Sequence, residues 1–344
     1  MRQLFLQAPN DLRMREIDDP KPGPGEVIVE VRGTTTCGTD LKTLRRGHPK
    51  FPMPTPFRHE FSGVVTDLGE GVKGWSVGSE VMCAPTAPCG NCAVCRRGLF
   101  NLCQTCMDGL ILGAFAEKVR VPAHIVGKNL YSKPKELDFF EAALMEPLAC
   151  AVYGQQQLPS LSQKKVAIIG AGPIGVLHQM LAGQQQPKQL LMIGRRAARL
   201  ALAEQVGADE VIDSEQEPDL VDAVMARTGG QGADVIIECT GQPEVWVDSV
   251  RATAPRGTTL LFGGCKGGTR VPLPFDIMWA RALTVLGVFH FTPGAVAESR
   301  KHLCSGNLPV RHLITEIRPM SDYLQIFEDL KSGKAVKYGI DPKA

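Results

Sequence analysis

The sequence predicts an α/β protein with two parts, a small β-barrel and a doubly wound parallel sheet. Two observations carry this prediction. Residues 1–150 hold short apolar runs separated by glycine and proline, whereas over residues 151–287 such runs alternate with helical patterns. The chain has 344 residues, which is too many for one ordinary core and suits two domains. We expect residues 288–344 to rejoin the first part.

Three apolar runs predict strands in the first part. They are Val27–Val31, which follows a segment rich in proline and glycine, and then Phe61–Val65 and Val77–Val81. Glycines stand at the turns between the runs. Short strands with frequent turns are more typical of a β-barrel than of a helical unit.

The second part reads as strands that alternate with helices. Apolar runs predict strands at 166–169, 190–193, 210–213, 235–238 and 259–263, and helical patterns cover 197–206 and 220–227. Such alternation predicts a parallel sheet with helices on both faces. The runs are continuous because both faces of a parallel strand are buried.

The bulk composition excludes several kinds of partner. The formal net charge is +2, so no basic face is large enough to indicate nucleic acid. No run approaches the roughly 20 apolar residues that a membrane helix needs. The first seven residues lack the apolar stretch of a signal peptide. We expect a cytoplasmic protein that binds neither nucleic acid nor a membrane.

A glycine-rich turn predicts a dinucleotide site. Gly170-Ala171-Gly172-Pro173-Ile174-Gly175 follows a predicted strand and opens a helix. The first glycine suits the tight turn, the second lets the backbone approach a pyrophosphate, and the third lets helix and strand pack closely. The free N–H groups of the helix N-terminus attract the phosphates. A plain glycine turn is the alternative, but the later strands favour a Rossmann unit.

The end of the next strand favours NADP over NAD. An NAD site usually has an acidic residue there for the ribose 2′-hydroxyl, but this strand ends in Gly194-Arg195-Arg196. A glycine leaves room for a 2′-phosphate, and guanidinium groups can pair with it. Arg199 joins these residues as a candidate for cofactor binding. The alternative is that the arginines are merely solvated.

Four clustered cysteines predict a structural zinc site. Cys89, Cys92, Cys95 and Cys103 have the spacing C-x2-C-x2-C-x7-C, and four thiolates on one loop suit a closed tetrahedral zinc site. An iron–sulfur cluster uses similar ligands, but the last gap differs and Gln104 replaces the usual proline. Cys106 is a spare thiol nearby. The remaining cysteines outside the two metal sets are expected to be packing residues: Cys83, Cys150, Cys239, Cys265 and Cys304.

A dispersed group predicts a second, catalytic zinc. Its members are Cys37, the pair His59-Glu60, and Glu146. Taken alone, each has an ordinary explanation, as a buried thiol or as a surface charge. Together they offer one sulfur, one nitrogen and carboxylate oxygens, which suits a catalytic zinc with an open position. The sequence thus predicts two zinc ions per chain.

The chain resembles the zinc-containing medium-chain alcohol dehydrogenases, in particular the sorbitol and threonine dehydrogenase branch. The resemblance rests on residues 37–40, His59-Glu60, the cysteine loop, residues 146–148 and the glycine turn, and it spans nearly the whole chain. It implies a GroES-like catalytic domain interrupted by a Rossmann domain. It also implies that Cys37, His59 and Glu146 bind zinc, with Glu60 as an alternating ligand.

The same resemblance implies a proton path and a departure from the family. Thr39 matches the hydroxyl that accepts the substrate proton, and Lys42 matches the outer relay position. The family usually has glycine where this chain has Arg58. Arg58 either pairs with Glu60 and tunes the metal, or faces the substrate.

If Arg58 faces the substrate, the cations near it in the sequence indicate which kind of substrate binds. The segment 41–59 holds Lys42, Arg45, Arg46, His48, Lys50 and Arg58, and no Asp or Glu. A substrate that faced these cations would be a phosphorylated or carboxylated polyol. A solvated loop with a structural arginine is the alternative.

The sequence therefore predicts an oxidoreductase that moves a hydride between a secondary alcohol or polyol, including phosphorylated or acidic ones, and NADP. One alternative is a reductase of the same fold that uses no catalytic zinc. The other is a non-enzymatic redox-sensing or interaction protein with a zinc ribbon. We expect a homodimer or homotetramer, with the apolar stretch 277–291 as a contact at the sheet edge.

Overall fold

The computed structural model describes residues 1–47 and 51–344, which form two compact units. Unit 1 comprises Met1–Ala149 and Phe291–Ala344, and unit 2 comprises Cys150–His290. The first boundary falls inside helix α5 (Met145–Gln156). In the described residues, no helix is both long and apolar enough to cross a membrane.

Unit 1 is built around a mixed sheet with the strand order β15-β16-β3-β5-β6-β8, and β7 also pairs with β3. Its strands are β3 (Val27–Thr35), β5 (Phe61–Leu68), β6 (Glu80–Cys83), β7 (Lys118–Val121), β8 (Leu130–Ser132), β15 (Ile314–Pro319) and β16 (Lys337–Asp341). A smaller sheet has the order β2-β1-β4, with β1 (Arg2–Ala8), β2 (Asp11–Glu16) and β4 (Thr55–Pro56). Strand β16 brings the last residues of the chain against β3.

The predicted strand at 77–81 is wrong in its first three residues, because β6 begins only at Glu80. Gly78 has a positive φ of 90°, and the N–H of Ser79 donates to the carbonyl of Ser76. A tight turn therefore occupies the start of the apolar run.

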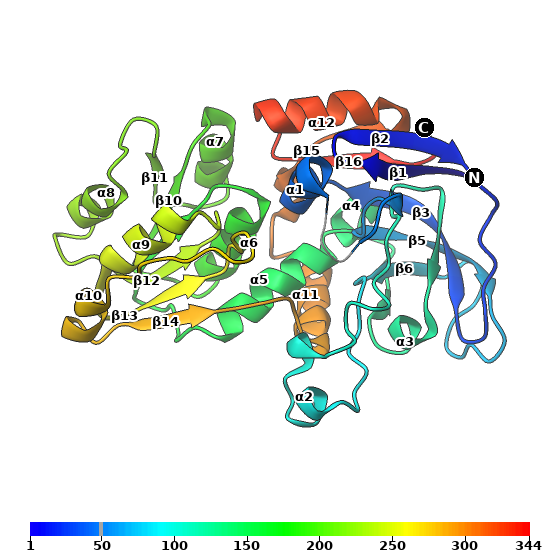
Figure 1. Cartoon of the computed structure of the whole chain (residues 1–344), viewed down its shortest axis with the longest axis horizontal. Helices are drawn as coiled ribbons and strands as arrows, with labels where there is room; N and C mark the ends of the chain where they lie inside the picture. Colours follow the sequence, from blue (N-terminus) through cyan, green and yellow to red (C-terminus); the bar gives the residue numbers. More distant parts are fainter. Residues whose placement is uncertain (48–50) are drawn as a thin grey trace. The chain divides into compact units, whose positions relative to one another are not determined.

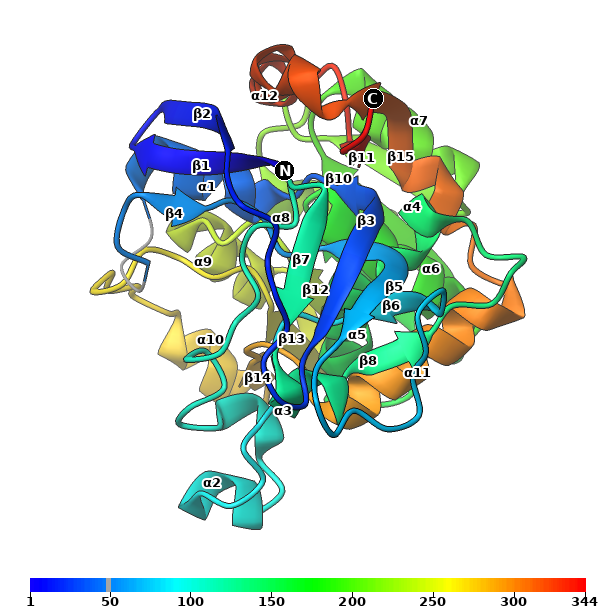
Figure 2. The same ribbon diagram turned by 90° about the vertical axis from the view of Figure 1, so that its right-hand side faces the viewer.

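Helices of 4 to 13 residues connect the strands of unit 1. They are α1 (Gly38–Arg46), α2 (Ala93–Arg96), α3 (Ala123–Val126), α4 (Phe139–Ala142), α11 (Pro293–Ser305) and α12 (Tyr323–Ser332), with the 3₁₀ turns η1 (Phe100–Leu102), η2 (Val310–Leu313) and η3 (Met320–Asp322). One core of unit 1 lies between β3, β5 and β6, and includes Val29, Phe61 and Val81. Figures 1 and 2 show that α2 lies in a segment that stands away from these strands. We call this segment, residues 89–106, the lobe.

Unit 2 confirms the predicted parallel sheet. All of its residues are described, and its six strands have the order β11-β10-β9-β12-β13-β14. They are β9 (Lys165–Ile169), β10 (Gln189–Gly194), β11 (Glu210–Asp213), β12 (Ala233–Glu238), β13 (Thr253–Leu261) and β14 (Thr284–Gly287). Strand β14 was not predicted as a strand: it is only four residues long, partly exposed at the sheet edge, and lies inside the apolar stretch 277–291 that was expected to make a contact there.

The helices of unit 2 cover both faces of the sheet (Figure 1). They are α6 (Pro173–Gly183), α7 (Ala197–Gln205), α8 (Leu220–Arg227), α9 (Pro243–Arg251) and α10 (Phe275–Ala280). From β9 the chain crosses through α6 to β10 on one side, and from β12 through α9 to β13 on the other. Crossover connections between parallel strands are right-handed, so two connections that run in opposite directions along the sheet place their helices on opposite faces. The strand order thus reverses between β9 and β12, where such sheets bind ligands at their carboxyl ends.

Candidate functional site

The pairing of β3 with β5 brings the predicted metal ligands of unit 1 together. Thr34 lies opposite Phe61 in this antiparallel pair, so the end of β3 meets the start of β5. Cys37 follows β3 by two residues, and His59 precedes β5 by two. One ligand atom each of Cys37, His59 and Glu60 lies within 4.8 Å of the others.

Glu146 lies beside this group. It stands in the first turn of α5, and its Oε2 is 3.8 Å from Nε2 of His59. The group whose ligand atoms all lie within 4.8 Å of one another contains Glu60 and not Glu146. In this arrangement Glu60 has the place among the ligands that the family pattern assigns to Glu146.

The two carboxylate oxygens of Glu60 have different surroundings. Oε2 accepts hydrogen bonds from the hydroxyl of Thr35 and from Nζ of Lys337, and it pairs with Nη2 of Arg58 at 2.7 Å. Oε1 is buried and has no hydrogen-bond partner. Burial alone would raise the pKa of Glu60, but the charges of Arg58 and Lys337 outweigh it and lower the pKa to about 2.

An unpartnered buried carboxylate oxygen is costly, and a metal ion is one group that would satisfy it. Oε1 of Glu60 belongs to a side chain grouped with a thiol and an imidazole. Sulfur, nitrogen and oxygen donors together are the set that a catalytic zinc accepts. The residues therefore fit zinc, and they leave room in its coordination for a further ligand.

Arg58 is fully buried between two acidic groups. Its Nη1 donates to Oδ1 of Asp40 at 2.7 Å, and its Nη2 pairs with Glu60. Burial alone would lower the pKa of Arg58, but the charges of Asp40 and Glu60 raise it above its usual range. The alternative in which Arg58 faces the substrate is wrong, because its guanidinium is enclosed and paired with protein carboxylates.

The backbone of Arg58 is strained. Its φ is 91°, a value that glycine adopts freely and that other residues rarely adopt. A side chain held there costs roughly 1–3 kcal/mol. The family's usual glycine would avoid this cost, so the contacts of the Arg58 side chain must offset it.

Four residues of the predicted proton path and cationic segment lie on α1 (Gly38–Arg46). Thr39 is in its first turn, but its side chain lies outside the described part of the structure. Lys42, Arg45 and Arg46 are exposed. His48 and Lys50 lie outside the described residues. Among the described residues, the three exposed cations of α1 support the hypothesis of an acidic substrate.

The four predicted zinc cysteines of the lobe lie close together. Ligand atoms of Cys89, Cys92, Cys95 and Cys103 all fall within 4.8 Å of one another. Cys106 packs against the same cluster but is not a member of this group. The local chain forms only the short elements α2 and η1 here, so little regular structure supports the cluster.

Backbone N–H groups prepare these thiols for a cation. The N–H of Cys92 donates to Sγ of Cys89, the N–H of Cys95 to Sγ of Cys92, and the N–H of Cys89 to Sγ of Cys103. Donors from Asn91 and Cys92 lower the pKa of Cys89 to about 6. Burial raises the pKa of Cys95 to about 12. A bound cation would bring all four to the thiolate form.

The other cysteines are only partly as expected. Cys83 is buried, in agreement with a packing role, and burial raises its pKa. Cys150, Cys239 and Cys265 are partly exposed. The expectation for Cys304 is wrong, because Cys304 is exposed near the end of α11. Its helical position next to apolar Leu303 suggested burial, but only Leu303 faces the core.

The glycine turn of unit 2 joins β9 to α6 as predicted. Gly170 has a φ of 111°, which only glycine adopts readily. A Cβ on Gly175 would lie 2.0 Å from the carbonyl oxygen of Gly170, so the helix can approach the strand only with glycine there. Gly172, Pro173 and Ile174 lie at the N-terminus of α6, which begins at Pro173. The turn lies at the carboxyl end of β9, where a dinucleotide site is expected.

Gly194 is required for a different reason from the one proposed. It is buried at the end of β10, and a Cβ there would lie 2.5 Å from Cβ of Ala171 in the glycine turn. The missing side chain thus makes room for the turn itself. Room for a phosphate must come from the residues that follow.

Three arginines follow Gly194 at the start of α7. Arg195 is exposed and Arg196 is partly exposed, while Arg199 is half-buried, with an Nε that is buried and lacks a hydrogen-bond partner. Burial and the charges of Arg196 and Arg195 lower the pKa of Arg199. In the described residues neither Arg195 nor Arg199 has an acidic partner. The positive charges of the three arginines repel one another, and a bound anion would relieve this repulsion.

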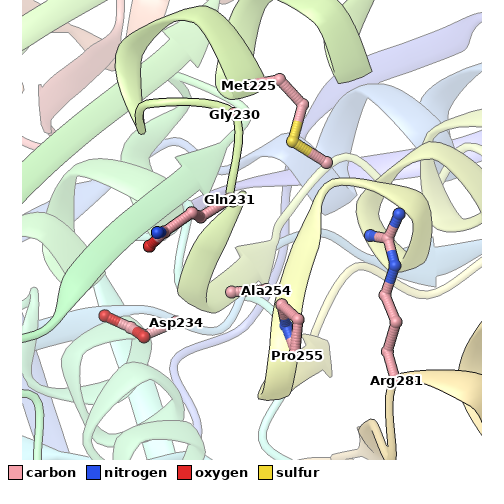
Figure 3. Close-up of a pocket in the computed structure, with 7 residues that line it drawn as sticks. All are labelled: Met225, Gly230, Gln231, Asp234, Ala254, Pro255 and Arg281. Atoms are coloured by element: carbon pink, nitrogen blue, oxygen red, sulfur yellow. The ribbon is translucent and has the colours of Figure 1, made fainter.

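A depression elsewhere in unit 2 is not part of this site. Figure 3 shows the residues that line it: Met225, Gly230, Gln231, Asp234, Ala254, Pro255 and Arg281. Asp234 and Ala254 stand at the amino ends of β12 and β13, opposite the glycine turn. Asp234 accepts the N–H of Lys165, and Arg281 donates to backbone carbonyls, so both charged groups already have partners.

Sequence reasoning missed two buried residues that contact the group formed by Cys37, His59 and Glu60. Lys337 is 1% exposed in β16 and donates to the carbonyl of Thr36 as well as to Glu60. Asp40 is buried and accepts the N–H of Cys37 at 2.8 Å. The available signal for Lys337 was its place at the start of a short strand, directly after the apolar pair Ala335-Val336. For Asp40, the only available signal was its nearness to Cys37 in the sequence.

Two family models match the chain. The alcohol dehydrogenase GroES-like domain matches residues 23–131, and the zinc-binding dehydrogenase domain matches residues 173–303. The chain is 36% identical over 331 residues to an L-threonine 3-dehydrogenase of Pyrococcus horikoshii, covering 94% of this chain and 92% of that protein. It is 29% identical over 333 residues to a sorbitol dehydrogenase of Halalkalibacterium halodurans, covering 96% and 95%.

Solved structures agree with these matches. A zinc-binding dehydrogenase of Sinorhizobium meliloti 1021 bound to NADP has a TM-score of 0.90 at 29% identity, covering 99% of each chain. The 2R,3R-butanediol dehydrogenase of Bacillus subtilis has a TM-score of 0.88 at 26% identity, with the same coverage.

Proposed function

Because the chain belongs to the zinc-containing medium-chain alcohol dehydrogenase family, we propose that it transfers a hydride between a secondary alcohol or polyol and NADP. The observation that carries the proposal is the grouping of Cys37, His59 and Glu60, with one oxygen of Glu60 buried and unpartnered. We propose two zinc ions per chain, one there and one at the four cysteines of the lobe.

The chain's own residues supply position and proton transfer. Cys37, His59 and Glu60 would hold the catalytic zinc, which when bound polarises the substrate hydroxyl and lowers its pKa. Thr39 lies two residues after Cys37, and its Oγ1 accepts the substrate proton and passes it towards Lys42 and solvent. The glycine turn holds the dinucleotide, which carries the hydride.

The relatives narrow the substrate class. The relatives named above include an L-threonine dehydrogenase, a sorbitol dehydrogenase and a butanediol dehydrogenase, whose substrates all contain a secondary alcohol. We propose a secondary alcohol with a second polar group on the neighbouring carbon. The exposed cations of α1 support an anionic group as one form of it.

The two rival functions are distinguished by family and metal content. Membership of a dehydrogenase family sets the non-enzymatic zinc-ribbon protein aside. A zinc-independent reductase would hold one zinc per chain, at the lobe. Metal analysis of the purified protein decides between one and two.

The test of the function is a substrate panel. L-Threonine, neutral polyols, sugar phosphates and hydroxy acids are assayed with NAD and with NADP, and kcat/KM is compared. We expect activity on at least one secondary alcohol and a higher kcat/KM with NADP. Equal rates on polyols and their phosphates would exclude a role for the cations of α1, and absence of activity on every class would contradict the proposal.

The preference for NADP is tested on the arginines themselves. Replacing Arg195 and Arg199 together by alanine removes two charged donors, each worth about 1.5–3 kcal/mol to a phosphate. We expect the Kd for NADPH to rise by at least about tenfold, with the Kd for NADH nearly unchanged, in a fluorescence titration. Arg270→Ala, at an exposed position of the same unit, is the control. A wild-type preference for NAD would contradict this part of the proposal.

We also propose a homo-oligomer in the cytoplasm. Phe275 and Trp279 of α10 are 74% and 81% exposed, close in sequence to the edge strand β14, and such apolar surface usually marks a contact. The grouping of four cysteines as a metal site suits a reducing compartment.

A further inference from the structure

Arg58 occupies a position at which the backbone favours glycine. Its φ of 91° is a conformation that an arginine adopts only when its surroundings hold it there. The carbonyl of Arg58 accepts N–H groups of both Gly113 and Ala114, so this conformation is tied to a neighbouring segment. The backbone here is therefore imposed by the fold, and the side chain has to be explained separately.

The side chain links two segments of the metal group. At one end, Nη1 donates to Asp40, whose other oxygen accepts the N–H of Cys37 at 2.8 Å. At the other end, Nη2 lies 2.7 Å from Oε2 of Glu60, the neighbour of His59. One buried guanidinium thus joins the loop that carries the thiol to the segment that carries the imidazole and the carboxylate.

The same contacts decide which oxygen of Glu60 is available. Oε2 is shared among Arg58, Lys337 and Thr35, whereas Oε1 has no partner. Rotation of the carboxylate would separate Oε2 from two buried cations, which is unfavourable because neither cation can reach water. Glu60 therefore offers a single oxygen to the metal group, in one orientation.

We propose that Arg58 is a positioning residue that holds Cys37 and Oε1 of Glu60 in the arrangement that binds the catalytic zinc and slows its release. This inference rests on the metal site of the proposed function. Arg58 does not touch the metal or the substrate in this role. It acts on the thiol of Cys37 by a direct contact and through Asp40, and on the carboxylate through Oε2.

The test measures zinc release from Arg58→Gly. Glycine relieves the backbone strain and removes both ion pairs, so a loss of metal retention cannot come from a new steric clash. Release from the zinc-loaded full-length protein is followed with a chromogenic chelator. Groups that orient metal ligands typically change affinity by about 10–100-fold, and we expect release from the Cys37 site to accelerate by about this factor.

The zinc of the lobe is the internal control. Its release from the four cysteines is expected at the wild-type rate, and the Cys37→Ser variant identifies which kinetic phase belongs to which site. A circular dichroism spectrum like that of the wild type shows that the variant is folded, and unchanged release of the lobe zinc shows that the effect is confined to the Cys37 site. In the cobalt-substituted protein, the visible absorption of the Cys37 site is expected to change in Arg58→Gly, while that of the four-thiolate site stays the same.

Two further variants separate the two ends of the link. Lys337→Met removes the other cation at Glu60 and leaves the contact to Asp40, whereas Asp40→Asn weakens both the ion pair with Arg58 and the contact to the N–H of Cys37 and leaves Glu60 unchanged. We expect each to accelerate release, and less than Arg58→Gly does. If Arg58→Gly does not fold, Arg58→Lys takes its place: a single ammonium cannot bridge both carboxylates, so release should still accelerate, and a wild-type rate there overturns the inference.

The results also separate this inference from the proposed function. Two zinc ions per chain, both released from Arg58→Gly at wild-type rates, would overturn the role of Arg58 and leave the dehydrogenase proposal intact. One zinc ion per wild-type chain, held by the lobe, would overturn the catalytic metal site itself.

Discussion

Two buried ionisable side chains show how differently single residues can be accommodated. Arg58 in unit 1 has an acidic group at each end, and its charge is retained. His178 in α6 of unit 2 is fully buried, and both of its ring nitrogens lack hydrogen-bond partners. Its ring packs edge-on against that of Phe262, with 4.6 Å between the ring centroids. Burial lowers the pKa of His178 to about 3, so this histidine stays neutral in the folded protein.

We predict that His178 makes the folded protein less stable in mild acid. Its pKa is 6.5 when exposed and about 3 when folded, so between these values the unfolded chain binds more protons. The free energy of unfolding should therefore fall as the pH drops below 6.5, by about 1.4 kcal/mol per pH unit from this residue. Urea unfolding at pH 7, 6 and 5 measures the slope.

The variant His178→Leu should lose this part of the slope and unfold at higher urea than the wild type at pH 5. Leu181→Met, a change of a side chain in the same helix that does not titrate, should keep the wild-type slope. Parallel curves for the wild type and His178→Leu would show that His178 does not titrate on unfolding.

At the level of secondary-structure elements, the two metal groups are assembled in different ways. The register of β3 against β5 brings Cys37 to His59, so an extensive sheet carries the geometry. The lobe around α2 has only four residues of α-helix and a short 3₁₀ turn, and its cluster consists mostly of cysteines. Because so little apolar surface is buried there, the free energy of metal binding must supply most of the stability of the lobe.

We predict that loss of one lobe cysteine unfolds the lobe alone. Cys95→Ser should lower the zinc content from two ions per chain to one, and limited proteolysis should then cut within residues 89–106. The zinc at Cys37 should remain, because sheet pairing holds that site. Cys304→Ser, at an exposed cysteine, should keep both ions and resist cleavage. Loss of both ions from Cys95→Ser would show that the two sites depend on each other.

For the whole molecule, the exposed apolar side chains of unit 2 indicate self-association. Phe275, Trp279 and Phe289 are all more than half exposed, and they flank β14, which ends the sheet order. An unpaired strand edge beside exposed aromatic rings is unfavourable for an isolated chain in water. Pairing with a second copy would cover both features at once.

We predict a dimer or tetramer that depends on α10. Trp279→Glu puts a charge into the expected contact and should reduce the mass measured by light scattering after size-exclusion chromatography. Leu324→Glu, at a position of α12 that is 64% exposed, should leave the mass unchanged. A wild-type protein that runs as a monomer would contradict the prediction.

The sequence by itself determined the features that depend on neighbouring residues. The glycine turn, the parallel strands of unit 2 and the spacing of the four cysteines could be read because each is encoded within a few residues. Edge strand β14 could not, because it has only four partly exposed residues and the longer apolar stretch 277–291 around it does not mark where a strand begins or ends.

Only the tertiary structure decided how the metal group is held. Lys337 reaches Glu60 across 277 positions of the chain, and no local pattern records such a contact. The sequence marked Arg58 as unusual but left it either facing the substrate or pairing with Glu60. Burial settled this choice, because a guanidinium removed from water must find carboxylates within the protein, and those of Asp40 and Glu60 are the ones that the fold brings to it.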